Sequence, residues 1–317
     1  MLEGKWDDRD MDSQRTAETH VVRDSIRQTL RYVKVSDPNL SLRYFPDFFI
    51  VGPQRTGTTW LHANLRYHPQ IMLAEPKELF FFSRLKTPDS ARYRSNDLEW
   101  YLRFFREPLW RVLMRNAMSL WQFRELYRPK VRGEATASYA ALDPDVIREV
   151  AALKPDIKVI LMIRDPIERA WSHAKKDLVR NKGRKFEDVS AAEFERFFSD
   201  PYQRQCARYA ENIDRWSACL QPDHLFIGLF DDIDSRPEAL LLESMSFLGV
   251  KSDRRYISSE VRHPVNPTGA SRIPERYRRF LEELLKDDIV KLKERFGLEW
   301  PSQAPAGGRH PCGAVGA

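Results

Sequence analysis

The chain has 317 residues and carries 52 Lys and Arg against 46 Asp and Glu, so its formal net charge is +6. A hydrophobic content of 42% is enough for a large core, which excludes a chain that is disordered throughout. The basic excess suits an anionic ligand, but acids are mixed with it too evenly to indicate binding of duplex nucleic acid. The cysteines form no C-x-x-C pair and the histidines no H-E-x-x-H motif, so we expect neither a disulfide framework nor a metal site.

Apolar runs along the chain are short. Residues 159–163 form one of the longest, which is far below the ~20 residues that cross a bilayer. The N-terminus is acidic and polar, with no apolar signal-peptide core. We therefore expect a cytoplasmic protein with no transmembrane segment.

Residues 1–40 are expected to form a polar extension of the protein. Four apolar residues recur there at helical spacing and predict one amphipathic helix laid on the body: Val22, Ile26, Leu30 and Val33. Residues 302–317 are rich in Pro, Gly and Ala and have almost nothing to bury, so a flexible tail is expected. No repeat or long linker interrupts residues 41–301, which we expect to fold as a single domain.

Within this domain, short apolar runs alternate with helical patterns. Strands are predicted at residues 48–51, 71–73, 158–163 and 225–230. Helices are predicted at residues 58–67, 208–220 and 273–296, and after the dipeptide at 165–166. This βαβα alternation predicts an α/β fold with a central parallel sheet flanked by helices.

The turn between the first strand and its helix is the first candidate site. Free backbone N–H groups and the positive end of the helix dipole converge there, and glycines allow an anion to approach closely. The spacing of Gly52 and Gly57 fits the nucleoside triphosphate motif G-x-x-x-x-G-K-[ST], but Thr58 stands where that motif has Lys. The cation is Arg55 instead, which lies lower in the loop and suits a shorter anionic group.

Residues 53–60, PQRTGTTW, resemble the phosphosulfate-binding loop of sulfotransferases that use 3′-phosphoadenosine 5′-phosphosulfate (PAPS), P-K-[ST]-G-T-[ST]-W. The resemblance implies a P-loop NTPase-like fold in which Arg55 takes the place of the usual Lys. It implies co-substrate contacts from six residues: Arg55, Thr56, Gly57, Thr58, Thr59 and Trp60. For Trp60 the resemblance implies stacking near the adenine, and packing in the core is the alternative.

A second candidate anion site follows the predicted strand at 158–163. Arg164 comes directly after this strand, and open α/β sheets bind ligands at the carboxyl ends of their strands. An Arg followed eight residues later by a Ser is similar to the PAPS family's motif for the 3′-phosphate, so the resemblance implies that Arg164 and Ser172 hold this phosphate. Arg169 and His173 are more typical of structural residues and are left out of the predicted site.

The segment at residues 73–82 presents Lys77 and Glu78 between a proline and a run of aromatics. A carboxylate beside apolar surface can act as a base near neutral pH, and a neighbouring lysine can bind an anion. The segment resembles the K-E-x-x-F-F run of carbohydrate sulfotransferases. The resemblance implies that Glu78 is the general base for the acceptor, while Lys77 and Arg55 stabilise charge on the transferred group. The alternative is a pair of solvated charges at a strand end.

Three further stretches resemble the same branch of the family. Residues 133–139 resemble its G-E-x-[ST]-x-x-Y stretch and are expected to line the acceptor side. The resemblance also implies that a late helix and loop finish the nucleotide pocket, through Tyr209, Gly269, Ala270, Ser271 and Arg272. Six aromatics could form an acceptor wall, although helical spacing favours the core for most of them: Trp100, Tyr101, Phe104, Phe105, Trp110 and Trp121.

The ordered set of motifs therefore predicts an enzyme, a PAPS-dependent sulfotransferase. It would transfer the sulfuryl group by in-line displacement to a hydroxyl or amine of a glycan, lipid or secondary metabolite, with no metal and no nucleic acid. Two alternatives are a P-loop kinase or NTPase, which needs a Mg²⁺ site, and a non-catalytic binder of nucleotides or acidic glycans.

Overall fold

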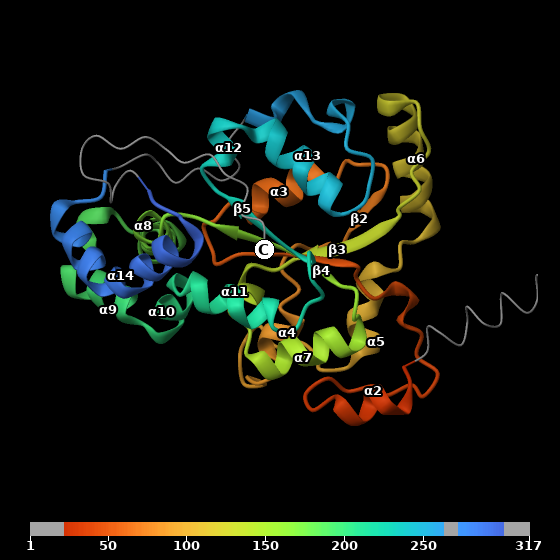
Figure 1. The fold of residues 1–317 in the computed structure, drawn as a ribbon, viewed down its shortest axis with the longest axis horizontal. Coiled ribbons are helices and arrows are strands. Elements are labelled where there is room, and N and C mark those ends of the chain that lie inside the picture. The colour runs from red at the N-terminus through yellow and green to blue at the C-terminus, as the bar shows by residue number, and fades with distance from the viewer. Residues whose placement is uncertain (1–21, 263–271, 301–317) are drawn as a thin grey trace, which may run out of the picture.

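A parallel sheet of five strands forms the centre of the computed structural model, which describes residues 22–262 and 272–300 (Figure 1). The strand order is β2-β3-β1-β4-β5, and every neighbouring pair is parallel. The strands are β1 (Phe48–Val51), β2 (Ile71–Leu73), β3 (Val131–Ala135), β4 (Lys158–Ile163) and β5 (Leu225–Leu229). This confirms the predicted α/β class and the four predicted strands, with β5 one residue shorter than expected.

The central strands have apolar sequences because they are buried on both faces of the sheet. All of β1 and nearly all of β4 are apolar and buried, as parallel strands under two helical layers require. Strand β3 was not predicted, because its sequence VRGEA lacks an apolar run. Gly133 makes it possible, since a Cβ atom there would lie 2.4 Å from Cζ of Phe48 on the neighbouring strand.

Helices cover both faces of the sheet (Figure 1). They are α2 (Asp24–Thr29), α3 (Thr58–Leu65), α4 (Phe81–Arg84), α5 (Leu98–Leu102), α6 (Leu109–Phe123), α7 (Pro144–Leu153), α8 (Pro166–Ala174), α9 (Ala191–Ser199), α10 (Pro201–Ala207), α11 (Tyr209–Ser217), α12 (Asp232–Ser235), α13 (Pro237–Phe247) and α14 (Glu275–Phe296). One apolar core joins α3, α12 and α13 to one face of the sheet, and a second joins α5, α7 and α11 to the other. A third core holds α8, α9 and α14 together.

The helix predicted in the N-terminal extension is shorter than expected. It ends at Thr29, and beyond Leu30 the backbone N–H groups of Arg31, Tyr32 and Val33 donate to the Glu149 carboxylate on α7 rather than to helical carbonyls. Val22 and Val33 still reach the core, but from extended chain on either side of α2. The domain boundary at residue 40 stays a prediction, and the predicted tail lies outside the described residues.

Within residues 22–262 and 272–300, no helix is both long enough and apolar enough to cross a bilayer.

Candidate active site

The candidate site lies where three adjacent strands end. Strand β1 is flanked by β3 and β4, and the helices that connect to these strands lie on opposite faces of the sheet: α3 follows β1 on one face, and α7 precedes β4 on the other. A crevice at the carboxyl ends of the strands is the usual ligand site in such a sheet. The predicted motifs follow these strands, since residues 52–57 come after β1 and Arg164 comes after β4.

The loop after β1 has a shape that only glycine permits at two positions. Gly52 has a φ of +152°, and a Cβ atom there would lie 2.5 Å from the Met162 carbonyl oxygen. Gly57, at the N-cap of α3, has a φ of +92°, and its Cβ would lie 2.4 Å from Ile233 Cδ1. The loop therefore turns tightly into α3, where the first backbone N–H groups have no partner within the helix.

The threonines of this loop divide into two kinds. Thr56 is buried and its hydroxyl donates to the Pro53 carbonyl over 2.9 Å, so it shapes the loop. Thr58 and Thr59 begin α3, the first buried and the second half-buried. Gln54 fixes the loop from outside, since its side-chain amide donates to the Tyr202 hydroxyl on α10 over 2.7 Å.

The two predicted anion motifs come together through Arg55. Its Nε donates to the Ser172 hydroxyl over 2.9 Å, and its backbone carbonyl accepts from Arg164 Nη1 at 3.3 Å. Arg55 adopts a φ of +79°, in the left-handed region that is uncommon outside glycine. The loop after β1 and helix α8 after β4 are therefore joined at the residues that the sequence singled out.

Several cations converge on this junction. Burial, together with the nearby positive charges of Arg164 and Arg180, lowers the pKa of the Arg55 guanidinium to about 10. Burial also lowers the pKa of Arg164, whose guanidinium lies 4.2 Å from the centroid of the Phe230 ring. Partly desolvated cations held this close favour a ligand that carries more than one negative charge.

Lys175 belongs to the same cluster, although the sequence analysis did not include it. Burial lowers the pKa of its ammonium group, which also feels the positive charges of Arg164 and Arg55. Lys175 lies one helical turn after Ser172. This spacing is the feature of the sequence from which its place beside Ser172 could have been predicted. Lys175 opens a π-helical turn, Lys175–Val179, that continues α8; such turns occur often at functional sites.

Helix α8 begins as predicted. The Asp165 carboxylate accepts from the backbone N–H groups of Ile167 and Glu168, and Pro166 is the first helical residue. Arg169 and His173 are buried, and both contact the side chain of Gln203. These contacts fit the structural roles expected for them.

Glu78 is held beside the end of β3. Its backbone N–H donates to the Ala135 carbonyl over 3.0 Å, and its carboxylate accepts from the Ala137 N–H at 3.3 Å and from Lys77 Nζ at 2.7 Å. Its φ of +70° is again left-handed. The Lys77 and Glu78 side chains are only 18% and 25% exposed, so they are not a freely solvated pair. Two strand spacings, about 10 Å, separate the ends of β3 and β4.

The stretch at 133–139 was expected to line the acceptor side, which stays a prediction. Its residues are buried and contact the segment that carries Glu78. Thr136 Oγ1 accepts from the Leu79 N–H at 3.1 Å and donates to the Glu134 carboxylate at 2.8 Å. The Tyr101 hydroxyl donates to the other Glu134 oxygen, and burial raises the pKa of Glu134 to about 7. Tyr139 is also fully buried. These side chains therefore support the segment that carries Glu78.

A cavity of about 360 Å³ opens beside Glu78. Its walls are formed by aromatic and basic side chains, among them Phe80, Arg92, Arg94, Trp100, Arg103 and Phe104. The Arg103 guanidinium lies 4.8 Å from the Trp100 ring centroid and 4.9 Å from that of Phe104. This arrangement offers both flat apolar surface and positive charge to an acceptor.

The six aromatics considered for an acceptor wall lie in three different places. Trp100 and Phe104 line the cavity, and Tyr101 and Phe105 are buried in the core. Trp110 and Trp121 are exposed on α6, so they belong neither to the core nor to this cavity. Helical periodicity in the sequence shows that a helix has an apolar side. It does not show whether that side faces the core or the solvent.

The remaining predicted contacts are less direct. Trp60 is only 3% exposed and its indole donates to the Val261 carbonyl, which fits packing in the core rather than stacking on a base. Tyr209 is buried, and its hydroxyl accepts from the Arg164 N–H at 3.4 Å, so it positions Arg164. Arg272 is exposed just before α14. The other three members of the late loop, Gly269, Ala270 and Ser271, lie outside the described residues.

Among the described residues, no three His, Cys, Asp or Glu side chains are grouped so that they could hold a metal ion.

Comparison with known proteins identifies the family. A sequence model described as "Sulfotransferase family" matches residues 46–254, more than half of the chain, and the chain belongs to this family. The mouse bifunctional heparan sulfate N-deacetylase/N-sulfotransferase 4 is 29% identical over 229 residues, which cover 67% of this chain and 23% of the mouse protein. The membrane-associated sulfotransferase kil1 of Dictyostelium discoideum is 31% identical over 127 residues, covering 40% of this chain and 22% of that protein.

The match to such relatives thus spans about a quarter of their length. Among solved structures, a sulfotransferase from Alicyclobacillus acidocaldarius superposes with a TM-score of 0.54 at 24% identity. The superposition covers 80% of this chain and 97% of that one, and it shows that the two share a fold.

Proposed function

We propose that this protein transfers a sulfuryl group from PAPS to a hydroxyl or amine of an acceptor. The observation that carries the proposal is the contact of Arg55 with Ser172, because it joins the motif expected to bind the phosphosulfate to the motif expected to bind the 3′-phosphate. A nucleotide with an anionic group at each end matches cations supplied by two loops. Membership of the sulfotransferase family supports the same activity.

The residues present fit such a co-substrate. The glycine turn leaves the N-terminus of α3 open to an oxyanion, and Arg55 and Lys175 add positive charge beside it. Arg164 and Ser172 are assigned to the 3′-phosphate. The Tyr209 hydroxyl accepts from the backbone N–H of Arg164 and so fixes the position of the Arg164 backbone, from which the guanidinium extends.

The chemistry assigned to the chain is proton removal and charge stabilisation. Glu78 accepts the proton of the acceptor hydroxyl or amine, whose oxygen or nitrogen forms a bond to sulfur while the bond from sulfur to the phosphate oxygen breaks. Arg55 and Lys77 stabilise the charge that develops on the sulfuryl and leaving phosphate oxygens. PAPS supplies the sulfuryl group and leaves as the adenosine bisphosphate.

The acceptor we propose is negatively charged and offers flat surface, such as a sulfated or carboxylated glycan. Three guanidiniums and three aromatic rings around the cavity beside Glu78 support this choice, from Arg92, Arg94, Arg103, Phe80, Trp100 and Phe104. The heparan sulfate named in the relatives is one such glycan. The cytoplasmic location stays a prediction.

The test is transfer of radiolabelled sulfate from PAPS to a panel of charged and neutral acceptors, with products identified by mass. Labelled product on a charged glycan is expected. In parallel, the adenosine bisphosphate should raise the melting temperature more than ATP with Mg²⁺ does, since binding to the folded state adds about 2.7 kcal/mol at a hundredfold excess over Kd. A larger shift with MgATP would favour the kinase alternative, and nucleotide binding without turnover would favour a non-catalytic binder.

A further inference from the structure

Helix α6 turns its apolar side to the solvent. It lies at the side of the molecule next to β2 (Figure 1). Trp121 is 82% exposed and Leu109 is 74% exposed. We define the α6 face as six exposed side chains: Leu109, Trp110, Leu113, Met114, Met118 and Trp121. At 100° per residue they occupy about half of the helix circumference, and no charged residue lies among them.

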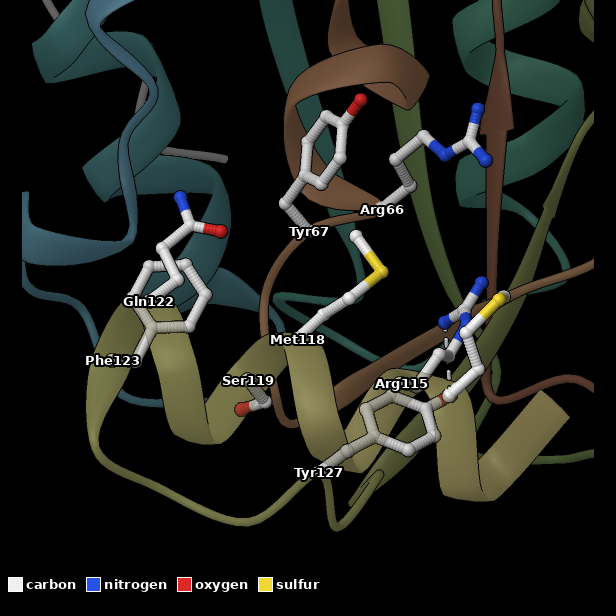
Figure 2. Close-up of a pocket in the computed structure, with 9 residues that line it drawn as sticks. Arg66, Tyr67, Arg115, Met118, Ser119, Gln122, Phe123 and Tyr127 are labelled. Carbon is white, nitrogen blue, oxygen red and sulfur yellow. Dashed lines mark hydrogen bonds between the residues drawn. The ribbon is translucent and has the colours of Figure 1, made fainter. Parts of the chain in front are cut away.

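The polar side of the same helix faces the protein, together with Phe123, which is buried in the core at the end of the helix. Arg115 Nη1 donates to the Tyr127 hydroxyl over 3.0 Å, and Arg115 Nε lies 3.4 Å from the Glu107 carboxylate. The Asn116 side chain accepts from the Tyr127 N–H at 2.9 Å. Figure 2 shows Arg115 and Tyr127 among the residues that line a small cavity at this helix, which Met118 also lines. The helix is thus amphipathic with its usual orientation reversed.

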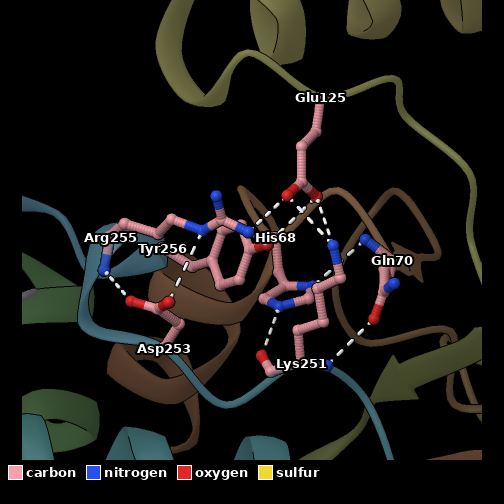
Figure 3. A network of polar contacts seen from close by, with 7 residues as sticks. All are labelled: His68, Gln70, Glu125, Lys251, Asp253, Arg255 and Tyr256. Carbon is pink, nitrogen blue, oxygen red and sulfur yellow. Dashed lines mark hydrogen bonds and ion pairs between the residues drawn. The ribbon is translucent and has the colours of Figure 1, made fainter.

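Contacts at both ends hold the helix in this orientation. Near its start, Arg111 lies 3.4 Å from the Glu75 carboxylate. Just beyond its end, the Glu125 carboxylate accepts from Lys251 Nζ and from the Tyr256 hydroxyl, each at 3.0 Å, and pairs with Arg255 (Figure 3). The exposed apolar face is therefore presented by an anchored helix, and not by a loose segment.

Positive charge is in excess in the segment that carries the α6 face. Residues 106–130 contain six Lys or Arg and two Glu, a balance of +4 within a chain whose total is +6. Both of these carboxylates, Glu107 and Glu125, are ion-paired to arginines. Arg124, Arg128 and Lys130 are exposed near the C-terminal end of the helix. A partner for this surface must accept apolar side chains and supply negative charge.

We propose that the α6 face docks on the surface of an anionic lipid bilayer. A helix with Trp and Leu on one side and basic residues around it is the pattern of helices that lie in the membrane interface. Tryptophans at both ends of the face suit the headgroup level, and long arginine stems can reach lipid phosphates while their methylenes stay apolar. Anionic lipids add about 1 kcal/mol for each basic residue near the surface.

The charges also argue against a second copy of this chain as the occupant. A symmetric contact between two α6 faces would bring two basic rims together, and like charges across an interface are unfavourable. An anionic bilayer, in contrast, would attract the same basic residues through its negatively charged headgroups.

The test is co-sedimentation of the full chain with vesicles of phosphatidylcholine, with or without about 30% phosphatidylserine, at about 0.1 M NaCl. Binding should require phosphatidylserine and weaken as salt rises. Trp110→Gln and Trp121→Gln together should lower the partition coefficient at least about tenfold. Val290→Gln removes an exposed apolar side chain on α14 and should leave binding unchanged.

Three outcomes would overturn the proposal. The first is no binding to phosphatidylserine vesicles. The second is binding that the tryptophan variant retains while its circular dichroism matches that of the unmodified chain. The third is a concentration-dependent dimer that forms without vesicle binding and is dissolved by the tryptophan variant in sedimentation velocity, which would assign the α6 face to a second copy.

Discussion

Arg55 and Ser172 are 117 residues apart in sequence, yet Arg55 Nε donates to Ser172 Oγ over 2.9 Å. One residue belongs to the loop after β1 and the other to the helix after β4. Since β1 and β4 are adjacent strands, the contact joins the two segments that follow their carboxyl ends. A change at either residue is therefore expected to disturb both halves of the nucleotide site.

Arg164→Ala should weaken binding of the adenosine bisphosphate at least about tenfold, and Ser172→Ala only a few-fold. A charge-assisted hydrogen bond is worth about twice a neutral one, which sets the order of the two losses. Titration calorimetry measures both, and Arg279→Ala, an exposed arginine on α14, is the matched control. The same loss for a nucleotide that lacks the 3′-phosphate would move these residues to another part of the site.

Lys175→Met tests the cation that the structure adds to the site. The substitution keeps the apolar stem and removes the charge beside Arg55 and Arg164. Nucleotide affinity should fall several-fold, while the melting temperature of the free protein should stay equal or rise because the mutual repulsion is relieved. Lys182→Met, at an exposed lysine in the turn after α8, should change neither quantity. An unchanged nucleotide Kd in Lys175→Met would exclude this lysine from the site.

Glu78→Gln keeps the shape of the side chain and removes its basicity. If Glu78 takes the acceptor proton, kcat should fall by roughly 10² to 10⁴ while nucleotide affinity stays within a few-fold. Steady-state kinetics with saturating acceptor and a direct nucleotide titration separate the two effects. Glu99→Gln, on the exposed side of α5, is the control. Retention of more than about half of kcat would remove Glu78 from the mechanism.

Glu134 should make the fold less stable as the pH rises. Burial raises the pKa of Glu134 from 4.5 to about 7, so the folded chain binds a proton that the unfolded chain has lost between these values. This stabilisation is complete below pH 4.5 and is lost as the pH rises to about 7, by about 3 kcal/mol. Glu134→Gln should therefore lose less stability than the unmodified chain between pH 5 and 8 in denaturant titrations, whereas Glu282→Gln should not differ from it. Parallel pH profiles for Glu134→Gln and the unmodified chain would contradict the assignment.

Most of the sheet could be predicted from the sequence, because strands buried on both faces are continuous apolar runs. Strand β3 could not, since Gly133 and Glu134 make it resemble a loop. Both residues are explained by tertiary contacts. Gly133 leaves room for the Phe48 ring, and Glu134 accepts a hydrogen bond from the Tyr101 hydroxyl. Neither contact leaves a periodic signal in the chain.

The motifs of the candidate site follow the strand ends because chain connectivity dictates where a strand-turn-helix segment places its loop. The sequence could not show which side chains from different elements become neighbours in the fold. Lys175 joins the site through a π-helical turn, and the exposed side of α6 depends on which neighbours its polar residues find. Trp60 had two interpretations of equal standing; its burial fits core packing, and stacking near the adenine stays a prediction.

Arg55 and Glu78 hold a left-handed backbone without being glycine, a feature that they share with Phe80, Arg124 and Asp223 among the described residues. Such a conformation costs about 1 to 2 kcal/mol per residue, so the fold would gain stability if either position were replaced by glycine. The side chains assigned to the chemistry therefore stand where the fold is under strain. A screen for heat-resistant variants is expected to select glycine at such positions, and variants changed at Arg55 or Glu78 should be checked first for lost turnover.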